Sequence, residues 1–85
     1  MTVTIRYFAW VRERTGRAEE TVDLPAEVRT VSDLVGWLRA RGPGYEAAFA
    51  AGRVVRVAID RSHVKGDPPI SGAREIAFFP PVTGG

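Results

Sequence analysis

The chain has no cysteine among its 85 residues. Disulfide bonds, thiolate metal sites, iron–sulfur clusters and a cysteine nucleophile are therefore excluded. It has only one histidine, His63, and only one lysine, Lys65. One histidine without a nucleophile cannot form a hydrolytic triad, and the sequence holds neither a P-loop nor a glycine-rich dinucleotide motif. We therefore expect no catalytic centre and no metal site built from side chains.

The sequence also lacks long runs of one charge and long apolar runs. Its 12 basic and 10 acidic residues give a net charge of +2, and they are interspersed from Arg6 to Arg74. Nucleic-acid binders instead show basic stripes interleaved with aromatic residues. No segment reaches the length of a membrane span, and the first residues do not have the pattern of a signal peptide. We therefore expect a cytoplasmic protein that binds neither nucleic acid nor membrane.

What the sequence does contain is the apolar–polar alternation of half-buried strands. This alternation runs through residues 2–7, 20–24 and 55–59, and a minimal strand is expected at Val64. Residues 75–79 form a more continuous apolar run, which is typical of a buried strand. The hydrophobic content of 45% is sufficient for one small folded domain.

The main helix is expected to begin at Thr30. Its hydroxyl, with the Asp33 carboxylate three residues later, resembles a capping box with Asp in place of Glu. Apolar residues then follow at helical spacing: Val31, Leu34, Val35 and Leu38. Gly42-Pro43-Gly44 predicts a stop, a short helix is expected over 45–51, and a helical turn over 12–14 should end at Gly16. Together the pattern predicts an α+β fold with a mixed sheet packed on one main helix.

The last eight residues combine three features. Phe78 and Phe79 close the final strand, and Pro80-Pro81 then ends sheet pairing because proline has no backbone N–H. Val82-Thr83-Gly84-Gly85 follows, and glycine lets a backbone pass through a narrow channel. We expect a domain over residues 1–79 and an extended tail over 80–85. Since the chain has no thiol, only the terminal carboxyl group could hold sulfur.

Residues 78–85 resemble the C-terminus of the small, sulfur-carrying subunits of molybdopterin synthase, the ubiquitin-like MoaD family. Residues 7–16, with Tyr7-Phe8-Ala9, Val11-Arg12-Glu13 and Gly16, resemble the first strand and following turn of that family. The resemblance covers nearly the whole chain in length and element order, and it implies a β-grasp fold. The chain departs from the family at Asp60, where asparagine is commoner, and at Ala73-Arg74, which replaces an acidic turn.

The resemblance implies a function for the tail. A partner would convert the Gly85 carboxylate to an acyl-adenylate with AMP from ATP, and a sulfur donor would then leave a thiocarboxylate. Gly84, Thr83, Val82, Pro81 and Pro80 would thread into a larger synthase subunit, where the sulfur passes to a cyclic pterin phosphate. No cofactor would be bound permanently.

The resemblance also implies partners. Two small subunits would flank a dimer of large subunits, and an adenylating enzyme and a sulfur donor would load the tail. The partner-binding patch would map onto Phe79, Phe8 and His63, although the family is usually apolar at the position of His63.

Other readings of a diglycine tail stay open. The sulfur could go to the thiazole of thiamin, to tRNA or to an amino-acid precursor. The chain could be a protein modifier that joins Gly85 to lysines of targets, or an interaction domain with an inert tail.

Overall fold

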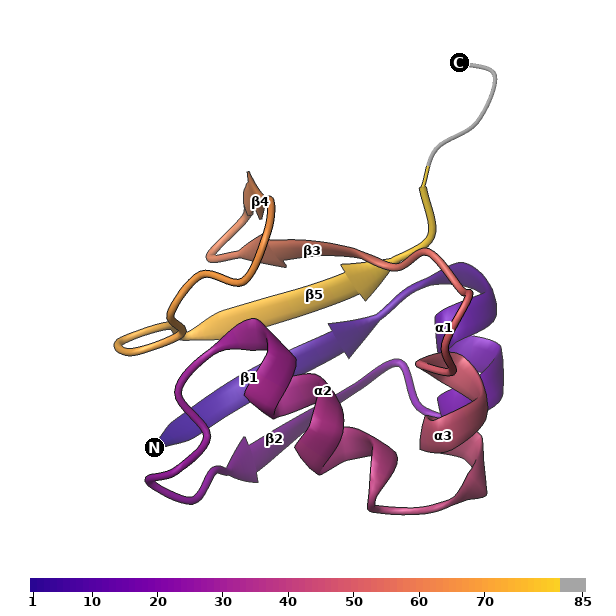
Figure 1. Ribbon diagram of the computed structural model, residues 1–85, viewed down its shortest axis with the longest axis horizontal. Helices are drawn as coiled ribbons and strands as arrows, with labels where there is room; N and C mark the ends of the chain where they lie inside the picture. The colour runs from indigo at the N-terminus through magenta and orange to yellow at the C-terminus, as the bar shows by residue number, and fades with distance from the viewer. Residues whose placement is uncertain (82–85) are drawn as a thin grey trace.

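The structure, a computed structural model, describes residues 1–81 and contains a five-stranded sheet with helices packed against it (Figure 1). The strands are β1 (Thr2–Tyr7), β2 (Glu19–Asp23), β3 (Arg56–Ile59), β4 (Ser62–Val64) and β5 (Glu75–Phe79). Their order across the sheet is β2-β1-β5-β3-β4. β1 and β5 run parallel at the centre, and the other neighbouring strands are antiparallel. The expected mixed sheet is therefore confirmed.

The helical layer consists of α2 (Val31–Arg39) and two shorter helices, α1 (Ala9–Thr15) and α3 (Pro43–Ala48). Figure 1 shows α2 crossing in front of the sheet, whereas α1 and α3 lie together at one end of it. α2 begins as the sequence predicts, because Thr30 and Asp33 form the reciprocal capping box. The α+β class with one main helix is confirmed, and the two short helices extend the layer.

Two helix boundaries differ from the prediction. α1 begins at Ala9 rather than with a turn over residues 12–14. α3 begins at Pro43 and ends at Ala48, instead of running from residue 45 to 51. The Gly42-Pro43-Gly44 stop does end α2, but the fixed φ of Pro43 also suits the first position of the next helix. Only residues 40–42 therefore separate the two helices, and Pro43 already belongs to the second one.

The core lies between the sheet and the helices, because side chains alternate between the two faces of a strand. Ile5 and Tyr7 of β1 pair in register with Ile76 and Phe78 of β5, and all four are fully buried. The Phe49 ring lies edge-on to the Phe78 ring, with 4.9 Å between centroids. The same cluster includes apolar residues of all three helices: Val11, Leu34, Leu38, Tyr45 and Ala48.

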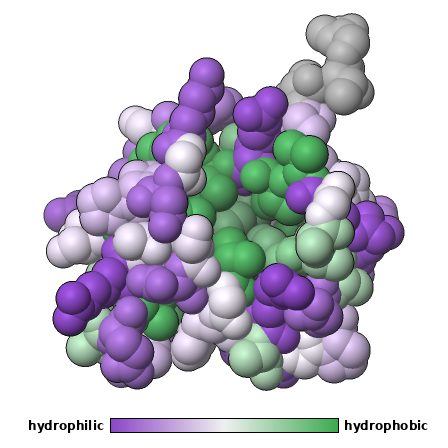
Figure 2. Space-filling model, viewed as in Figure 1, coloured by the Kyte–Doolittle hydropathy of each residue, from purple (hydrophilic) through white to green (hydrophobic). Residues whose placement is uncertain are grey.

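The helices do not cover the sheet completely. Figure 2 shows apolar side chains gathered in a hollow over the middle of the molecule, on the side from which α2 is seen. Several aliphatic side chains pack against the core but stay half-buried: Val35, Val55, Val57 and Ile59. The β3–β4 side of the sheet is therefore the more open one.

Candidate docking surface

The three residues proposed as a partner-binding patch lie together on the face of the sheet opposite the core. Phe8 follows β1, His63 lies on β4 and Phe79 ends β5. Because Tyr7 and Phe78 point into the core, Phe8 and Phe79, one position further along, point to the opposite face. All three residues line one shallow depression of about 460 Å³. The structure therefore brings the three residues together, and their role as a binding patch stays a prediction.

Two alanines form the floor of this depression. Ala58 of β3 pairs with both Ala77 of β5 and His63 of β4, so the three side chains lie in one row across the sheet. Small side chains in the middle of the row leave space that Phe8 and Phe79 border on one side. The depression is completed by Ala9, Arg61 and Pro80. We call these eight residues the open-face patch: Phe8, Ala9, Ala58, Arg61, His63, Ala77, Phe79 and Pro80.

Aromatic contacts hold the patch in place. The imidazole of His63 lies against the Phe79 ring, with 5.1 Å between centroids and 47° between the ring planes. The Arg6 guanidinium lies 5.2 Å from the centre of the Phe8 ring. Phe8 is still 40% exposed. Large apolar surfaces of this kind on soluble proteins commonly serve as binding sites.

The β3–β4 turn positions His63. Asp60 and Arg61 adopt the left-handed conformation, with φ values of 48° and 70°. The Asp60 Oδ1 accepts hydrogen bonds from the backbone N–H groups of Glu75 and Arg74, both at 2.9 Å. These bonds lower the pKa of the Asp60 carboxyl below its ordinary value. The turn is thereby tied to the start of β5, which fixes β4 beside the strand that carries Phe79.

Charged side chains occupy the rest of the open face. Arg6 forms ion pairs with Glu75 at 3.2 Å and with Glu19 at 4.0 Å, and Arg61 approaches Glu75 at 3.7 Å. Such exposed pairs add little stability. These side chains form a charged part of the open face. It meets the open-face patch, from which the tail departs, at Arg61.

The tail begins at the edge of the open-face patch. Pro80 lines the patch, and Pro80 and Pro81 are both half-buried. In Figure 1 the segment of residues 80–81 turns away from the sheet after β5. The predictions for Val82, Thr83, Gly84 and Gly85 fall outside the described residues.

A separate polar cluster lies near the β2 edge, and no pattern in the sequence indicates it. The Glu20 Oε2 accepts hydrogen bonds from the hydroxyls of Tyr7 at 2.7 Å and Tyr45 at 2.8 Å, and Oε1 accepts one from Arg41 at 2.8 Å. Burial raises the pKa of the Glu20 carboxyl, but the three hydrogen bonds outweigh burial and leave its pKa below the ordinary value. Burial and the nearby carboxylate raise the pKa of Tyr7. Because Glu20 lies on β2 and Tyr45 on α3, the cluster is suited to hold α3 against the sheet.

Neither a metal centre nor a membrane span is found in residues 1–81. No three His, Asp or Glu side chains in this part of the chain are placed to share a metal ion. None of its helices has the length and apolar character needed to cross a bilayer.

A family model described as the ThiS family matches residues 5–85. The chain belongs to the ThiS family. It is 32% identical to the molybdopterin synthase sulfur carrier subunit of Escherichia coli (strain K12), over 98% of this chain and 99% of that protein. It is 30% identical to the protein of the same name from Haemophilus influenzae, again over 98% and 99%. The expected similarity to molybdopterin synthase small subunits is therefore confirmed.

Solved structures agree with the β-grasp prediction for this ThiS-family chain. SAMP1 from Haloferax volcanii superimposes with a TM-score of 0.75 at 24% identity, covering 100% of both chains. A putative molybdopterin converting factor subunit 1 from Pyrococcus furiosus gives a TM-score of 0.71 at 25% identity, over 96% of this chain and 99% of that one.

Proposed function

We propose that this chain is the sulfur-carrying small subunit of a molybdopterin synthase. The observation that carries the proposal is its similarity, along almost its whole length, to proteins named molybdopterin synthase sulfur carrier subunit. The family match extends to Gly85. The absence of any thiol supports the terminal carboxyl group as the sulfur-bearing group.

Loading of the tail proceeds in two steps. The Gly85 carboxylate attacks the α-phosphate of ATP on an adenylating enzyme, which releases pyrophosphate and forms an acyl-adenylate. A donor that supplies sulfur at the oxidation level of sulfide then attacks the carbonyl carbon, and AMP leaves. The product is a thiocarboxylate, and no net oxidation or reduction occurs at the carbon.

Transfer takes place on the larger subunit of the synthase. The thiocarboxylate sulfur attacks a carbon of the cyclic pterin phosphate, and a C–S bond forms there as the bond from that carbon to a phosphate oxygen breaks. The phosphate leaves that carbon and stays attached through its other ester oxygen. Water then cleaves the resulting thioester, which restores the Gly85 carboxylate and leaves the sulfur on the pterin. The dithiolene of molybdopterin needs two sulfurs, so two loaded carriers act in turn. An assembly with two small subunits flanking a large-subunit dimer supplies both.

The open-face patch docks the carrier on the large subunit. Phe79, backed by His63, anchors the carrier near the mouth of the channel that takes the tail. Pro80 and Pro81 cannot extend the pairing of β5, and their fixed φ values lower the conformational entropy lost when the tail enters. Gly84 then passes the narrowest part of the channel, where a Cβ would collide.

Intact-mass spectrometry tests the proposal. The full chain is incubated with ATP, a cognate adenylating enzyme and a sulfur donor, and the mass should show the exchange of one oxygen for one sulfur. A chain lacking Gly85 should keep its fold and lose the exchange. A truncated chain that still transfers sulfur would contradict the proposal.

The same reactions separate the other readings. Covalent adducts of this chain on lysines of other proteins would favour a protein modifier, and transfer to thiazole or tRNA but not to the pterin precursor would favour another sulfur pathway. An unchanged mass with every cognate activator would favour the remaining hypothesis, an interaction domain with an inert tail.

A further inference from the structure

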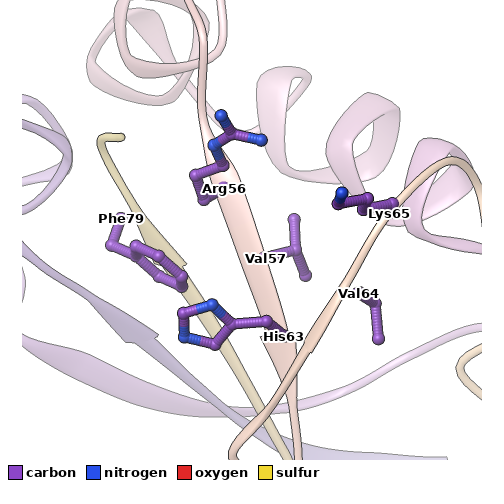
Figure 3. Close-up of a pocket in the computed structure, with 6 residues that line it drawn as sticks. All are labelled: Arg56, Val57, His63, Val64, Lys65 and Phe79. Carbon is purple, nitrogen blue, oxygen red and sulfur yellow. The ribbon is translucent and has the colours of Figure 1, made fainter. Parts of the chain in front are cut away.

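A second hollow lies beside the open-face patch, at the β4 edge of the sheet. It has a volume of about 240 Å³ and is lined by Arg56, Val57, His63, Val64, Lys65 and Phe79. Figure 3 shows the rings of Phe79 and His63 side by side, whereas the side chains of Val57 and Val64 lie on the other side of β3. His63 and Phe79 belong to both hollows. The β4 hollow is therefore continuous with the proposed docking surface.

The β4 hollow lies at the edge of the sheet and is lined from both faces. Val57 and Val64 belong to the core face, because Val57 pairs with Phe78, whereas Phe79 and His63 belong to the open face. The antiparallel register pairs Val57 with Val64, so Arg56 and Lys65 occupy the next positions on the two chain segments. Like charges on neighbouring segments of a sheet repel each other. Among residues 1–81, Arg56 and Lys65 form no ion pair with a carboxylate, in common with Arg12, Arg14, Arg17, Arg29, Arg53 and Arg74. No carboxylate of this part of the chain lines the hollow to offset the repulsion.

The size of the hollow restricts what it can bind. Sites for cofactors and drug-sized ligands usually occupy about 300–1,000 Å³. The β4 hollow is smaller, and it suits one or two side chains of a protein partner. An apolar group would contact Phe79, and a negative group would complement Arg56, which pairs with Phe79, and Lys65.

We infer that the β4 hollow binds an acidic–apolar segment of the large synthase subunit, with a carboxylate of that segment held by Lys65 and Arg56. The inference rests on the function proposed above and specifies the chemistry of the partner at one edge of the docking surface. Contacts between opposite charges at the rim of an interface mainly accelerate association and make it salt-dependent. The β4 hollow therefore adds charge recognition to the apolar anchor provided by Phe79.

Charge variants test the inference through the affinity of the full chain for the large subunit. Lys65→Glu and Arg56→Glu should each weaken binding roughly tenfold and flatten its salt dependence, because each places a negative charge opposite the partner carboxylate. Lys65→Arg, which keeps the charge, should bind like the parent chain. Arg17→Glu is the matched control, because Arg17 is exposed and precedes β2 at the opposite edge of the sheet.

The single lysine allows a direct test of contact. A carbodiimide joins a carboxylate to an amine without a spacer, and Lys65 is the only side-chain amine of this protein. Coupling in the complex should therefore join Lys65 to an Asp or Glu of the large subunit, as mapped by peptide mass spectrometry. Lys65→Arg should abolish this cross-link while leaving the affinity unchanged.

The outcomes distinguish the inference from the proposed function. If the parent chain binds the large subunit but Lys65→Glu and Arg56→Glu bind equally well, and no cross-link forms at Lys65, the inference is wrong and the docking proposal stands. If the parent chain neither binds the large subunit nor acquires sulfur, the proposed function fails and the inference fails with it. Unfolding curves of the variants show that a loss of binding does not arise from loss of the fold.

Discussion

Replacement of Glu20 by glutamine is expected to destabilise the protein markedly, although Glu20 lies apart from the docking surface. The Glu20 side chain is only 7% exposed, and it accepts hydrogen bonds from Tyr7, Tyr45 and Arg41. A hydrogen bond to a charged group contributes about 1.5–3 kcal/mol, against about 0.5–1.5 kcal/mol for a neutral one. Glutamine keeps the shape, but it removes the charge and presents an N–H group to one of the donors.

The expected loss follows from these contacts. With three charge-assisted bonds weakened or broken, Glu20→Gln should lower the free energy of unfolding by roughly 2–3 kcal/mol. In a domain of this size the midpoint of thermal unfolding should fall by roughly 10–20 °C. Glu19→Gln is the matched control, because the Glu19 side chain is 61% exposed and its one ion pair spans 4.0 Å. That change should stay within about 0.5 kcal/mol.

Urea unfolding measures both variants, with a shifted midpoint and an unchanged slope as the expected result for Glu20→Gln. If Glu20→Gln lowers the free energy of unfolding as little as Glu19→Gln does, the reasoning is refuted. The charge of the buried carboxylate would then add nothing to stability beyond what the shape of the side chain provides.

The pH dependence supplies a second check on Glu20. Because the folded-state pKa of Glu20 lies below its ordinary value, its contribution is present above the unfolded-state pKa of about 4.3 and is lost as pH falls through the folded-state pKa. The difference between the parent chain and Glu20→Gln should therefore be largest above about pH 5 and should shrink in more acidic solution. A difference that grows on acidification would contradict the assignment.

Three further predictions concern the backbone. Gly44→Ala should destabilise the protein by roughly 1–3 kcal/mol, because the added methyl would collide with the Arg14 carbonyl oxygen. Gly36→Ala should instead stabilise it by up to about 1 kcal/mol, because Gly36 lies within α2 with open space around it. Urea unfolding compares the two variants. Asp60→Asn should be tolerated better than Asp60→Ala, because asparagine keeps an acceptor oxygen and suits the left-handed conformation, and equal losses in thermal unfolding would contradict this. Thr30→Ala should lower stability by about 1 kcal/mol through loss of the α2 cap, and an unchanged urea midpoint would be the contrary result.

The sequence predicted most of the sheet because burial on one face imposes a period of two. The short helices were harder to place. Seven residues of α1 give fewer than two full helical periods, so the start at Ala9 could not be distinguished from an irregular turn. Pro43 was interpreted as part of a stop, although proline is also favoured at the first position of a helix. In both places the local signal fits two structures, and packing of α1 against α3 decides between them.

The same contrast applies to the site. Phe8 and Phe79 were predicted from the family resemblance, and alternation agrees, because it assigns them to the open face once Tyr7 and Phe78 are assigned to the core. Contacts between residues far apart in the chain produce no such pattern in the sequence. Glu20, for example, lies 13 residues from Tyr7 and 25 residues from Tyr45 along the chain. Ala58 and Ala77 were also missed, although each occupies an outward position between two apolar inward ones, and that spacing could have revealed them.

The end of β5 shows why the core and the docking surface cannot be varied independently. Phe78 is fully buried, Phe79 lines the open-face patch and Pro80 ends the pairing of β5 with its neighbouring strands. Three successive residues therefore have three different structural roles. A slip of β5 by one residue against β1 would exchange the faces of the two phenylalanines. It would bury Phe79 and leave Phe78 on the open face, and it would also separate Phe78 from the rings of Tyr7 and Phe49. The aromatic packing that stabilises the core therefore also fixes where Phe79 is presented and where the tail leaves the sheet.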